Sequence, residues 1–375
     1  MLLVAASMAV SGCRKEERSS SPAAPPPAAA SAPPPKSSLA SSPAPATTEK
    51  EDEPDPPDPA VTPAMLEEKF QRGELTGAYR PIGIDLVVLA NSGKVAAVDR
   101  FPEALHKHGE SIGGAWVASD GTLFAAGYMV TGLPGPDTGV VYRRDAQSKT
   151  KIVYTRPGLE LAATWGRSRN DVFAGGRSVL VHWDGAAWTD SPLGGVDGAI
   201  IDIWGTEREL YLVTNTDAAG SIYRRTGDGG WVKEASTDCG LRSIRGFGTS
   251  VWAAGGCGVV LHRNDDGTWK EERRRGRAQL FQLAAVSPTE SYAAGGRLLH
   301  GKNGEWSYVS LPLSHVYAVV ASGPSDVYAL GTEGVFHGAG TTWKKVAFDA
   351  TNCQHLVMLG ASLACLREHH VAVKD

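Results

Sequence analysis

The sequence lacks the motifs that mark the common catalytic sites. It has no G-x-S-x-G nucleophile elbow, no P-loop, no H-E-x-x-H helix and no EF-hand loop. Its five cysteines include no C-x-x-C pair, so a zinc site is not indicated. A net charge of -4 leaves no basic excess for nucleic-acid binding. We therefore expect no metal, no cofactor and no nucleic-acid partner.

Two pairs of histidines are possible metal ligands, but the residues around them do not supply the remaining ligands. His106 and His108 are separated by one residue, and His369 directly precedes His370. No pattern of Asp, Glu or Cys beside them supplies the remaining ligands. We interpret all four as surface histidines.

Long hydrophobic runs are also missing, apart from residues 1–13, MLLVAASMAVSGC. This run is too short to cross a bilayer as a helix, and residues 1–12 are predicted to be a signal peptide. Its last four residues, VSGC, resemble the lipobox of bacterial lipoproteins, which implies that Cys13 carries lipid. Because Arg14 follows, the resemblance also implies sorting to the outer membrane. No Lys or Arg precedes the run, so a secretory signal with an incidental cysteine is the alternative.

Residues 13–64 are rich in proline, alanine and serine, and their end is acidic. Fourteen of the 23 prolines lie between residues 14 and 63. Such a composition cannot bury enough apolar surface to offset chain entropy, so we predict a disordered tether. At ~3 Å per residue the tether would reach on the order of 100 Å. A short helical lead-in is expected at 65–76, and a folded domain at 77–375.

The folded part repeats with a period of about 40 residues. Three series of side chains keep the same phase. The first series is aromatic: Phe124, Phe173, Tyr211, Trp252, Tyr292 and Tyr328. The second is Tyr142, His182, Tyr223, His262, His300 and His337, and the third is Trp188, Trp231, Trp269, Trp306 and Trp343. Coincidence does not hold three series in step over so many units, so the repeat is structural.

Each unit contains four short runs with the alternation of β-strands. In residues 160–191 these runs are ELAATWG, DVFAGG, VLVHWD and AAWTDS. Asp-Gly or Asn-Gly separates the third and fourth runs of several units, because tight hairpins need a positive φ at their centre. Four antiparallel strands in a repeat of this length predict an all-β fold, a β-propeller, since helical repeats would show a period of about 3.6 residues.

Six complete units cover residues 115–348. Residues 84–101 supply one or two further strands before them, and residues 355–375 supply three after them. Because an unfinished sheet would expose a raw edge, we predict that both remnants share one sheet. The N- and C-terminal strands would then close a ring of seven four-stranded blades. Six or eight blades are the alternatives.

The stretch DVFAGGRSVLVHWDGAAW, residues 171–188, gathers several side chains that could form a binding site. However, His182, Trp183 and Trp188 lie at a phase that recurs in unit after unit. We therefore predict that they pack between blades, and that Asp184 serves the hairpin turn.

The four cysteines of the folded part form two candidate disulfides. Cys239 and Cys257 lie on either side of the turn at 246–250, and positions equidistant from a hairpin turn face each other. Cys353 and Cys365 flank the corresponding hairpin of the last unit. An oxidising compartment would permit both bridges, and buried free thiols are the alternative.

Units such as TWGRSRNDVFAGGRSVLVHWDGAAW (164–188) and VVASGPSDVYALGTEGVFHGAGTTW (319–343) resemble the repeats of bacterial exported propellers. These are of the BNR or Asp-box type, with a WD-like architecture, and commonly have no assigned activity. The resemblance covers residues 115–348 and implies the fold more than a function.

TGDGGW (226–231) and NDDGTW (264–269) are shortened forms of the sialidase Asp-box hairpin. A sialidase also needs an arginine triad, a tyrosine nucleophile with a glutamate partner, and an aspartate acid/base. YRPIG (79–83) is similar to its Arg-Ile-Pro motif only with Pro and Ile exchanged, and no further arginines mark a triad. A degenerate glycoside hydrolase is therefore the alternative function.

Two departures from the repeat are expected on one rim of the ring. The first unit carries an insertion, GYMVTGLPGPDTG (127–139), between its second and third strands. The loop KEERRRGR (270–277) contains four arginines: Arg273, Arg274, Arg275 and Arg277. This basic cluster is a candidate site for an anionic partner, such as a carboxylated glycan or an acidic protein segment. The alternative is a solvated charge run balanced by Glu271 and Glu272.

These features predict an exported β-propeller that acts as a monomeric, non-enzymatic binding or assembly scaffold. Its partners would be the membrane, through the lipid on Cys13, and an envelope protein or a glycan. It would lie on the periplasmic or the surface face of the outer membrane. A purely structural surface protein is a third alternative.

Overall fold

The computed structural model describes residues 79–89, 95–100, 110–129, 137–145, 149–217, 219–348, 350 and 353–372. The chain divides into two units, Met1–Pro57 and Asp58–Asp375, and every described residue belongs to the second. The predicted signal peptide, Cys13, the tether and the helical lead-in lie outside the described residues. Within those ranges, no helix is long and apolar enough to cross a membrane.

The described residues form an all-β structure of four-stranded antiparallel sheets, as the repeat predicted. In six of these sheets the four strands are consecutive in the chain. Three sheets consist of β3 (Glu110–Val117), β4 (Leu123–Met129), β5 (Thr138–Arg144) and β6 (Lys151–Pro157); β7 (Leu161–Ser168), β8 (Asp171–Gly176), β9 (Val179–Trp183) and β10 (Trp188–Asp190); and β11 (Ala199–Gly205), β12 (Leu210–Asn215), β13 (Gly220–Arg225) and β14 (Trp231–Thr237).

The next three sheets consist of β15 (Leu241–Phe247), β16 (Ser250–Gly255), β17 (Val260–Arg263) and β18 (Trp269–Arg273); β19 (Gln282–Ser287), β20 (Glu290–Gly295), β21 (Arg297–Lys302) and β22 (Glu305–Tyr308); and β23 (Val316–Gly323), β24 (Asp326–Gly331), β25 (Gly334–Ala339) and β26 (Thr342–Lys345). A single 3₁₀ turn, η1 (Gly256–Gly258), links β16 to β17.

The seventh sheet combines the first and the last strands of the described chain. It contains β1 (Tyr79–Leu89), β2 (Val95–Arg100), β27 (Cys353–Leu359) and β28 (Ser362–Ala372), in the order β2-β1-β28-β27. Strand β1 pairs antiparallel with β28, from Tyr79 opposite Ala372 to Leu89 opposite Leu363. Hydrogen bonds between strands from both ends of the domain therefore complete this sheet.

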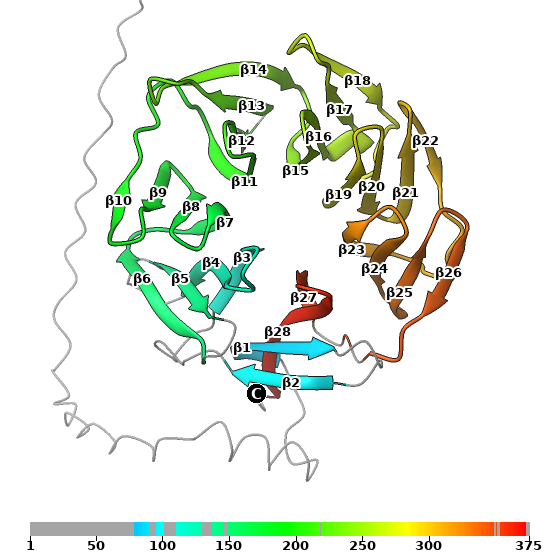
Figure 1. Cartoon of the computed structure of the whole chain (residues 1–375), viewed down its shortest axis with the longest axis horizontal. Coiled ribbons are helices and arrows are strands. Elements are labelled where there is room, and N and C mark those ends of the chain that lie inside the picture. The colour runs from blue at the N-terminus through cyan, green and yellow to red at the C-terminus, as the bar shows by residue number, and fades with distance from the viewer. Residues whose placement is uncertain are drawn as a thin grey trace, which may run out of the picture. The chain divides into compact units, whose positions relative to one another are not determined.

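One strand of each sheet faces the centre of this unit (Figure 1). These inner strands are β3, β7, β11, β15, β19, β23 and β27. Each one contacts the inner strands of the two neighbouring sheets, and β27 contacts β3. The hydrophobic core lies between neighbouring sheets: one cluster combines Phe173 and Leu180 of the β7–β10 sheet with Ile203 and Leu212 of the next.

The recurring histidine stacks on the recurring aromatic ring of its own sheet. The ring centroids of Phe173 and His182 are 4.2 Å apart, because these residues face each other across β8 and β9. His182 Nε2 is also bonded to the carboxylate of Asp171 at 2.8 Å. The same arrangement holds Tyr328 and His337 4.3 Å apart. For His182 the predicted packing between blades was therefore wrong: the ring packs within one blade.

The recurring tryptophans do join neighbouring sheets. The ring of Trp188 lies 5.5 Å from that of Tyr154 in the preceding sheet. The indole N–H of Trp269 donates to Glu234 of β14 at 3.0 Å, and that of Trp306 donates to Glu272 of β18 at 2.8 Å. These contacts explain why a tryptophan recurs in the outer strand.

The alternative interpretation of residues 270–277 was a solvated charge run that includes Glu272. In the structure, the side chain of Glu272 is buried: it is 5% exposed and accepts hydrogen bonds from His262 and from Trp306 of the next sheet. Burial opposes ionisation, but these two hydrogen bonds outweigh it and lower the pKa of Glu272. The sequence places Glu272 among charged neighbours, whereas a bulge in β18, with Glu272 as its extra residue, turns the side chain into the interface.

Near its start, each inner strand carries one residue more than its partner strand accommodates. The extra residues of the β-bulges are Gly113, Ala162, Ile201, Arg242, Tyr317 and Gln354. Phe281, directly before β19, has the same place, since its backbone N–H donates to Ala294, which also pairs with Gln282. A bulge re-aims the extra side chain. We call these seven the mouth residues.

The glycine that ends the second strand lies opposite the bulge. A Cβ on Gly176 would stand 1.8 Å from the carbonyl oxygen of Glu160, and one on Gly255 would stand 2.2 Å from that of Gly240. Real side chains do not tolerate such distances to backbone atoms. The repeated final glycine of runs such as DVFAGG is thus a consequence of the bulge.

Candidate functional site

The structure places the four predicted arginines in different environments. Arg273 is only 7% exposed. One of its nitrogens donates to the carbonyl oxygen of Gly258 at 2.7 Å, and another lies 3.4 Å from the hydroxyl oxygen of Tyr308. Arg273 therefore does not lie on the exposed rim where the sequence placed it, because it ends β18 with its side chain turned toward the next sheet.

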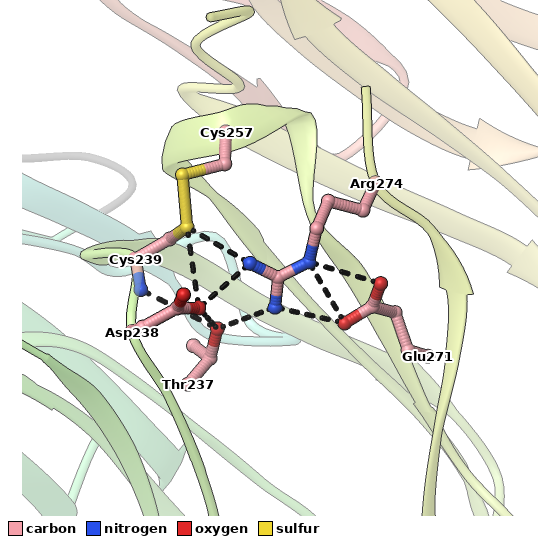
Figure 2. Close-up of polar contacts among 6 residues, drawn as sticks. All are labelled: Thr237, Asp238, Cys239, Cys257, Glu271 and Arg274. Carbon is pink, nitrogen blue, oxygen red and sulfur yellow. Dashed lines mark hydrogen bonds and ion pairs between the residues drawn. A yellow bond between two sulfur atoms is a disulfide. The ribbon is translucent and has the colours of Figure 1, made fainter. Parts of the chain in front are cut away.

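Arg274 is held by groups of the same chain, as Figure 2 shows. Its Nε donates to Glu271 at 3.0 Å, and its Nη1 donates to Asp238 at 2.6 Å and to the sulfur of Cys239 at 3.3 Å. Hydrogen bonds to Glu271 and Asp238 raise the pKa of Arg274. The guanidinium ties the end of β18 to the connection between β14 and β15, beside the Cys239–Cys257 bridge.

Arg275 and Arg277 are exposed, and neither forms an ion pair with another described residue. Recognition of an anionic partner by the four arginines stays a prediction. Residues 130–136 of the insertion lie outside the described residues. The two kinds of loop do share one face, since the backbone N–H of Arg275 bonds to Cys257 and that of Gly158 bonds to Asp137.

Both predicted disulfides are confirmed. Cys239 bonds to Cys257 and Cys353 bonds to Cys365, with Cα separations of 6.0 Å and 5.7 Å. The first bridge joins the start of one sheet to η1, and the second joins β27 to β28.

No described group of three or more His, Cys, Asp or Glu residues is placed to hold a metal. His106 and His108 lie outside the described residues, and the side chains of His369 and His370 are not described either. The interpretation of these histidines as surface residues stays a prediction.

Two adjoining cavities lie among the inner strands, and residues from every inner strand line them. The cavity near the strand starts has a volume of about 200 Å³, and the one toward the strand ends about 300 Å³. The residues that line both are Ala115, Thr164, Arg245, Gln282 and Leu356. We call the two cavities together the central channel.

All seven mouth residues line the smaller cavity, which we call the channel mouth. The side chains around it differ in size: Gly113 and Ala162 are on one side, and larger side chains are on the other. Phe281 and Tyr317 are 39% and 47% exposed, and the guanidinium of Arg242 lies 5.9 Å from the centre of the Phe281 ring. Exposed aromatic rings beside an arginine are typical of binding surfaces.

Beneath the mouth, polar side chains tie inner strands to their neighbours. The hydrogen bonds join Asp202 to Ile244, Ser243 to Leu283, Gln282 to Val319 and His355 to Ile112. The imidazole of His355 donates to the Ile112 carbonyl at 2.7 Å, and burial lowers the pKa of His355. These bonds make the base of the mouth a preformed frame rather than a flexible loop.

The carboxylate of Asp202 is fully engaged within this frame. It accepts hydrogen bonds from the backbone N–H groups of Ile203 and Ile244, both at 2.9 Å, and from Arg245 at 2.6 Å. Asp202 is 9% exposed. Its role is to hold β11 against β15, and it offers no free oxygen for acid/base chemistry.

Sequence reasoning did not find the channel mouth. The mouth residues occupy one position of the repeat, but their types differ from unit to unit, from Gly113 to Arg242 and Tyr317. The residue directly before each of them is more uniform and apolar: Ile112, Leu161, Ile200, Leu241, Leu280, Val316 and Cys353. Variation at one position of a regular repeat was the available signal.

No family model matches the sequence, and no curated protein matches it. Among solved structures, the chain is similar to the WD40 β-propeller domain of Doa1, at 12% identity with a TM-score of 0.53, over 78% of this chain and 95% of that one. Another match is the extracellular domain of BT4673 from B. thetaiotaomicron, described as a putative one component system, at 12% identity, with a TM-score of 0.47, over 72% and 40% of the two chains.

The likeness to the Doa1 domain and the four-stranded sheets together identify the fold as a β-propeller. At this level of identity the likeness shows the fold alone. The resemblance to BNR and Asp-box repeats therefore stays a prediction.

Proposed function

We propose that this protein is an exported, lipid-anchored propeller of seven blades that binds a partner at its channel mouth and catalyses no reaction. The observation that carries the proposal is the mouth itself. There, a hydrogen-bonded frame of inner strands presents Arg242, Phe281 and Tyr317 to solvent. Binding groups on a rigid scaffold are the usual arrangement for recognition.

The pairing of β1 with β28 and the contact of β27 with β3 support a closed ring of seven blades. Closure packs every blade between two neighbours and holds the mouth residues of all inner strands in place.

The two disulfides favour an oxidising compartment and thus export. The lipobox-like residues 10–13 favour attachment through Cys13, and Arg14 favours the outer membrane, on its periplasmic or surface face. In this proposal the protein is a monomer held to the membrane by lipid alone.

Replacing Cys13 by serine should release the protein into the soluble fraction, because the lipid would have no thiol to which it could attach. Fractionation of envelopes from cells that produce the wild type and the C13S variant measures the effect. Ala28→Ser is the matched control, since it introduces a serine into the predicted tether and leaves Cys13 in place. Continued membrane association of C13S would contradict the lipid anchor.

The chemistry of the mouth supports binding over hydrolysis. A sialidase-like reaction needs a tyrosine nucleophile with a glutamate partner and a free acid/base carboxylate. Among the described residues, no carboxylate is hydrogen-bonded to Tyr317, and Asp202 is engaged by Arg245 and two backbone N–H groups. We therefore favour the scaffold over the degenerate glycosidase.

The partner that fits the mouth best is a protein segment with an acidic side chain next to an apolar one. Arg242 would pair with the carboxylate, and the rings of Phe281 and Tyr317 would cover the apolar group. A glycan is the second candidate, because the same two exposed rings can stack on sugar faces.

A photo-crosslinking amino acid at Tyr317 tests the site in living cells. We expect one discrete protein adduct, and Arg242→Glu should reduce it at least about tenfold, because a charge-assisted hydrogen bond is lost and repulsion replaces it. The matched control is the same crosslinker at Phe247, which is 45% exposed and ends the same inner strand that carries Arg242. Equal labelling from both positions would overturn the site, and an adduct free of protein would indicate a glycan.

A further inference from the structure

A separate cavity of about 270 Å³ lies between the β15–β18 sheet and the β19–β22 sheet. Arg273 from the end of β18, Arg297 from the start of β21 and Tyr308 from the end of β22 line it. The backbone of Gly295 and Gly296 completes the wall between the two sheets. We call this cavity the interblade pocket. It shares no residue with the channel mouth.

The pocket contains a buried cation without a counter-charge. Arg273 is 7% exposed, and its hydrogen-bond partners are the carbonyl of Gly258 and the hydroxyl of Tyr308, both neutral. No carboxylate of the described residues forms an ion pair with Arg273 or with Arg297. Burial lowers the pKa of Arg273, and the nearby charge of Arg275 acts in the same direction. A buried guanidinium is stable only when a partner satisfies it.

Two guanidinium groups also gather on one aromatic ring. The carbon at the centre of the Arg297 guanidinium lies 5.4 Å from the centre of the Tyr308 ring, and that of Arg273 lies 6.0 Å from it. The ring attracts each cation, and both guanidinium groups line the same pocket. An anion bound in the pocket would give both of them a counter-charge.

The neighbouring interface shows how this chain neutralises such arginines elsewhere. Between the β11–β14 and β15–β18 sheets, Glu234 accepts hydrogen bonds from Arg224 and Arg263. In the interface that contains the pocket, the corresponding carboxylate is Glu272, which is bonded to His262 and Trp306 and does not line the pocket. Arg273 and Arg297 therefore lack such a partner, and a ligand would supply the negative charge.

We propose that the interblade pocket binds a doubly charged oxyanion, a phosphate or sulfate group, through Arg273, Arg297 and Tyr308. The planar guanidinium presents paired N–H donors that match two oxygens of such a group, and two arginines match its charge. Tyr308 is 51% exposed, so the group can reach the pocket from solvent. The proposal does not depend on binding at the channel mouth.

Isothermal titration of the full chain with inorganic phosphate, at ionic strength held constant with chloride, tests the pocket. We expect saturable binding with one site, and competition by sulfate. Arg297→Gln should weaken phosphate binding at least about tenfold without unfolding the protein, since Arg297 is exposed. Arg273→Lys keeps the positive charge but loses the paired N–H donors of the guanidinium, and should also weaken phosphate binding.

Arg177→Gln is the matched control, because it removes the same charge from an exposed arginine outside the pocket and outside the arginine cluster of residues 273–277. We expect its affinity for phosphate to stay within about twofold of the wild type. Glycerol phosphate distinguishes the source of the group: tighter binding than inorganic phosphate indicates a phosphate ester, and weaker binding indicates the free ion. Absence of saturable binding, or equal weakening by R297Q and R177Q, would overturn the proposal.

Discussion

Replacing Gly176 by alanine should destabilise the protein by about 3 kcal/mol or more, although the substitution adds a single methyl group. The new Cβ would stand 1.8 Å from the carbonyl oxygen of Glu160 and 3.0 Å from the Cα of Leu161. These are backbone atoms of the bulged inner strand, so no side-chain rotation relieves the contact. Either the bulge or the pairing of β7 with β8 must shift. Urea unfolding at neutral pH measures the loss.

Gly194→Ala provides the control for this prediction. A Cβ on Gly194 would meet no atom of the described residues within 4 Å, and the backbone there has no positive φ. Its replacement should change the free energy of unfolding by less than about 0.5 kcal/mol. A similar loss of stability in both variants would contradict this prediction. It would mean that replacing any glycine is destabilising, and that the close approach at the bulge does not explain the recurring glycine at the end of the second strand.

Replacing Glu234 by glutamine should destabilise the protein by about 3 kcal/mol at neutral pH. The Glu234 side chain is 9% exposed and accepts hydrogen bonds from Arg224, from Arg263 at 2.8 Å and from the indole of Trp269 at 3.0 Å. The neutral amide leaves two guanidinium groups between the sheets without their counter-charge. Urea unfolding again measures the change.

The same carboxylate predicts how stability depends on pH. Burial raises the pKa of Glu234, but hydrogen bonds from Arg263 and Arg224 outweigh it, so the net pKa lies below the ordinary 4.5. A group with a lower pKa in the folded state stabilises fully above 4.5 and loses its contribution as the pH falls through the folded-state pKa. The difference between the wild type and E234Q should therefore shrink in acid.

Glu271→Gln is the control for the buried carboxylate. Glu271 is 40% exposed and pairs with Arg274 on the surface, where solvent screens the interaction. We expect a loss below about 1 kcal/mol. Comparable losses in E234Q and E271Q would contradict the assignment of Glu234 as the acceptor that joins two sheets.

The periodic residues predicted the fold because each of them is needed for a structural feature that recurs from unit to unit. Alternating apolar runs make strands, Asp-Gly and Asn-Gly make hairpins, and a recurring tryptophan such as Trp269 joins its blade to the previous one. The Cys239–Cys257 bridge was predictable for the same reason, because positions flanking one hairpin face each other. Cys353 lies opposite Arg367 and Cys365 lies opposite Leu356, so the second bridge joins diagonal positions of its hairpin across a bulge.

The burial of the arginines in residues 273–277 could not be predicted in this way. A bulge at Glu272 breaks the alternation of β18, so Glu272 and Arg273 both face the next sheet. Arg274 follows the strand and stays at the surface with Glu271 and Asp238. Which side is buried depends on the next sheet, whose Tyr308 lies 35 residues further along the chain. A count of charges in the loop could not assign these positions.

The amino-acid order by itself determined the all-β class, the repeat, the hairpin turns and the disulfide pairs, because all of these depend on contacts within one sheet. Only the tertiary structure decided the channel mouth and the interblade pocket. Arg242, Phe281 and Tyr317 come from three different sheets, as Arg273 and Arg297 come from two. They meet because bulges and the packing of neighbouring sheets direct them together.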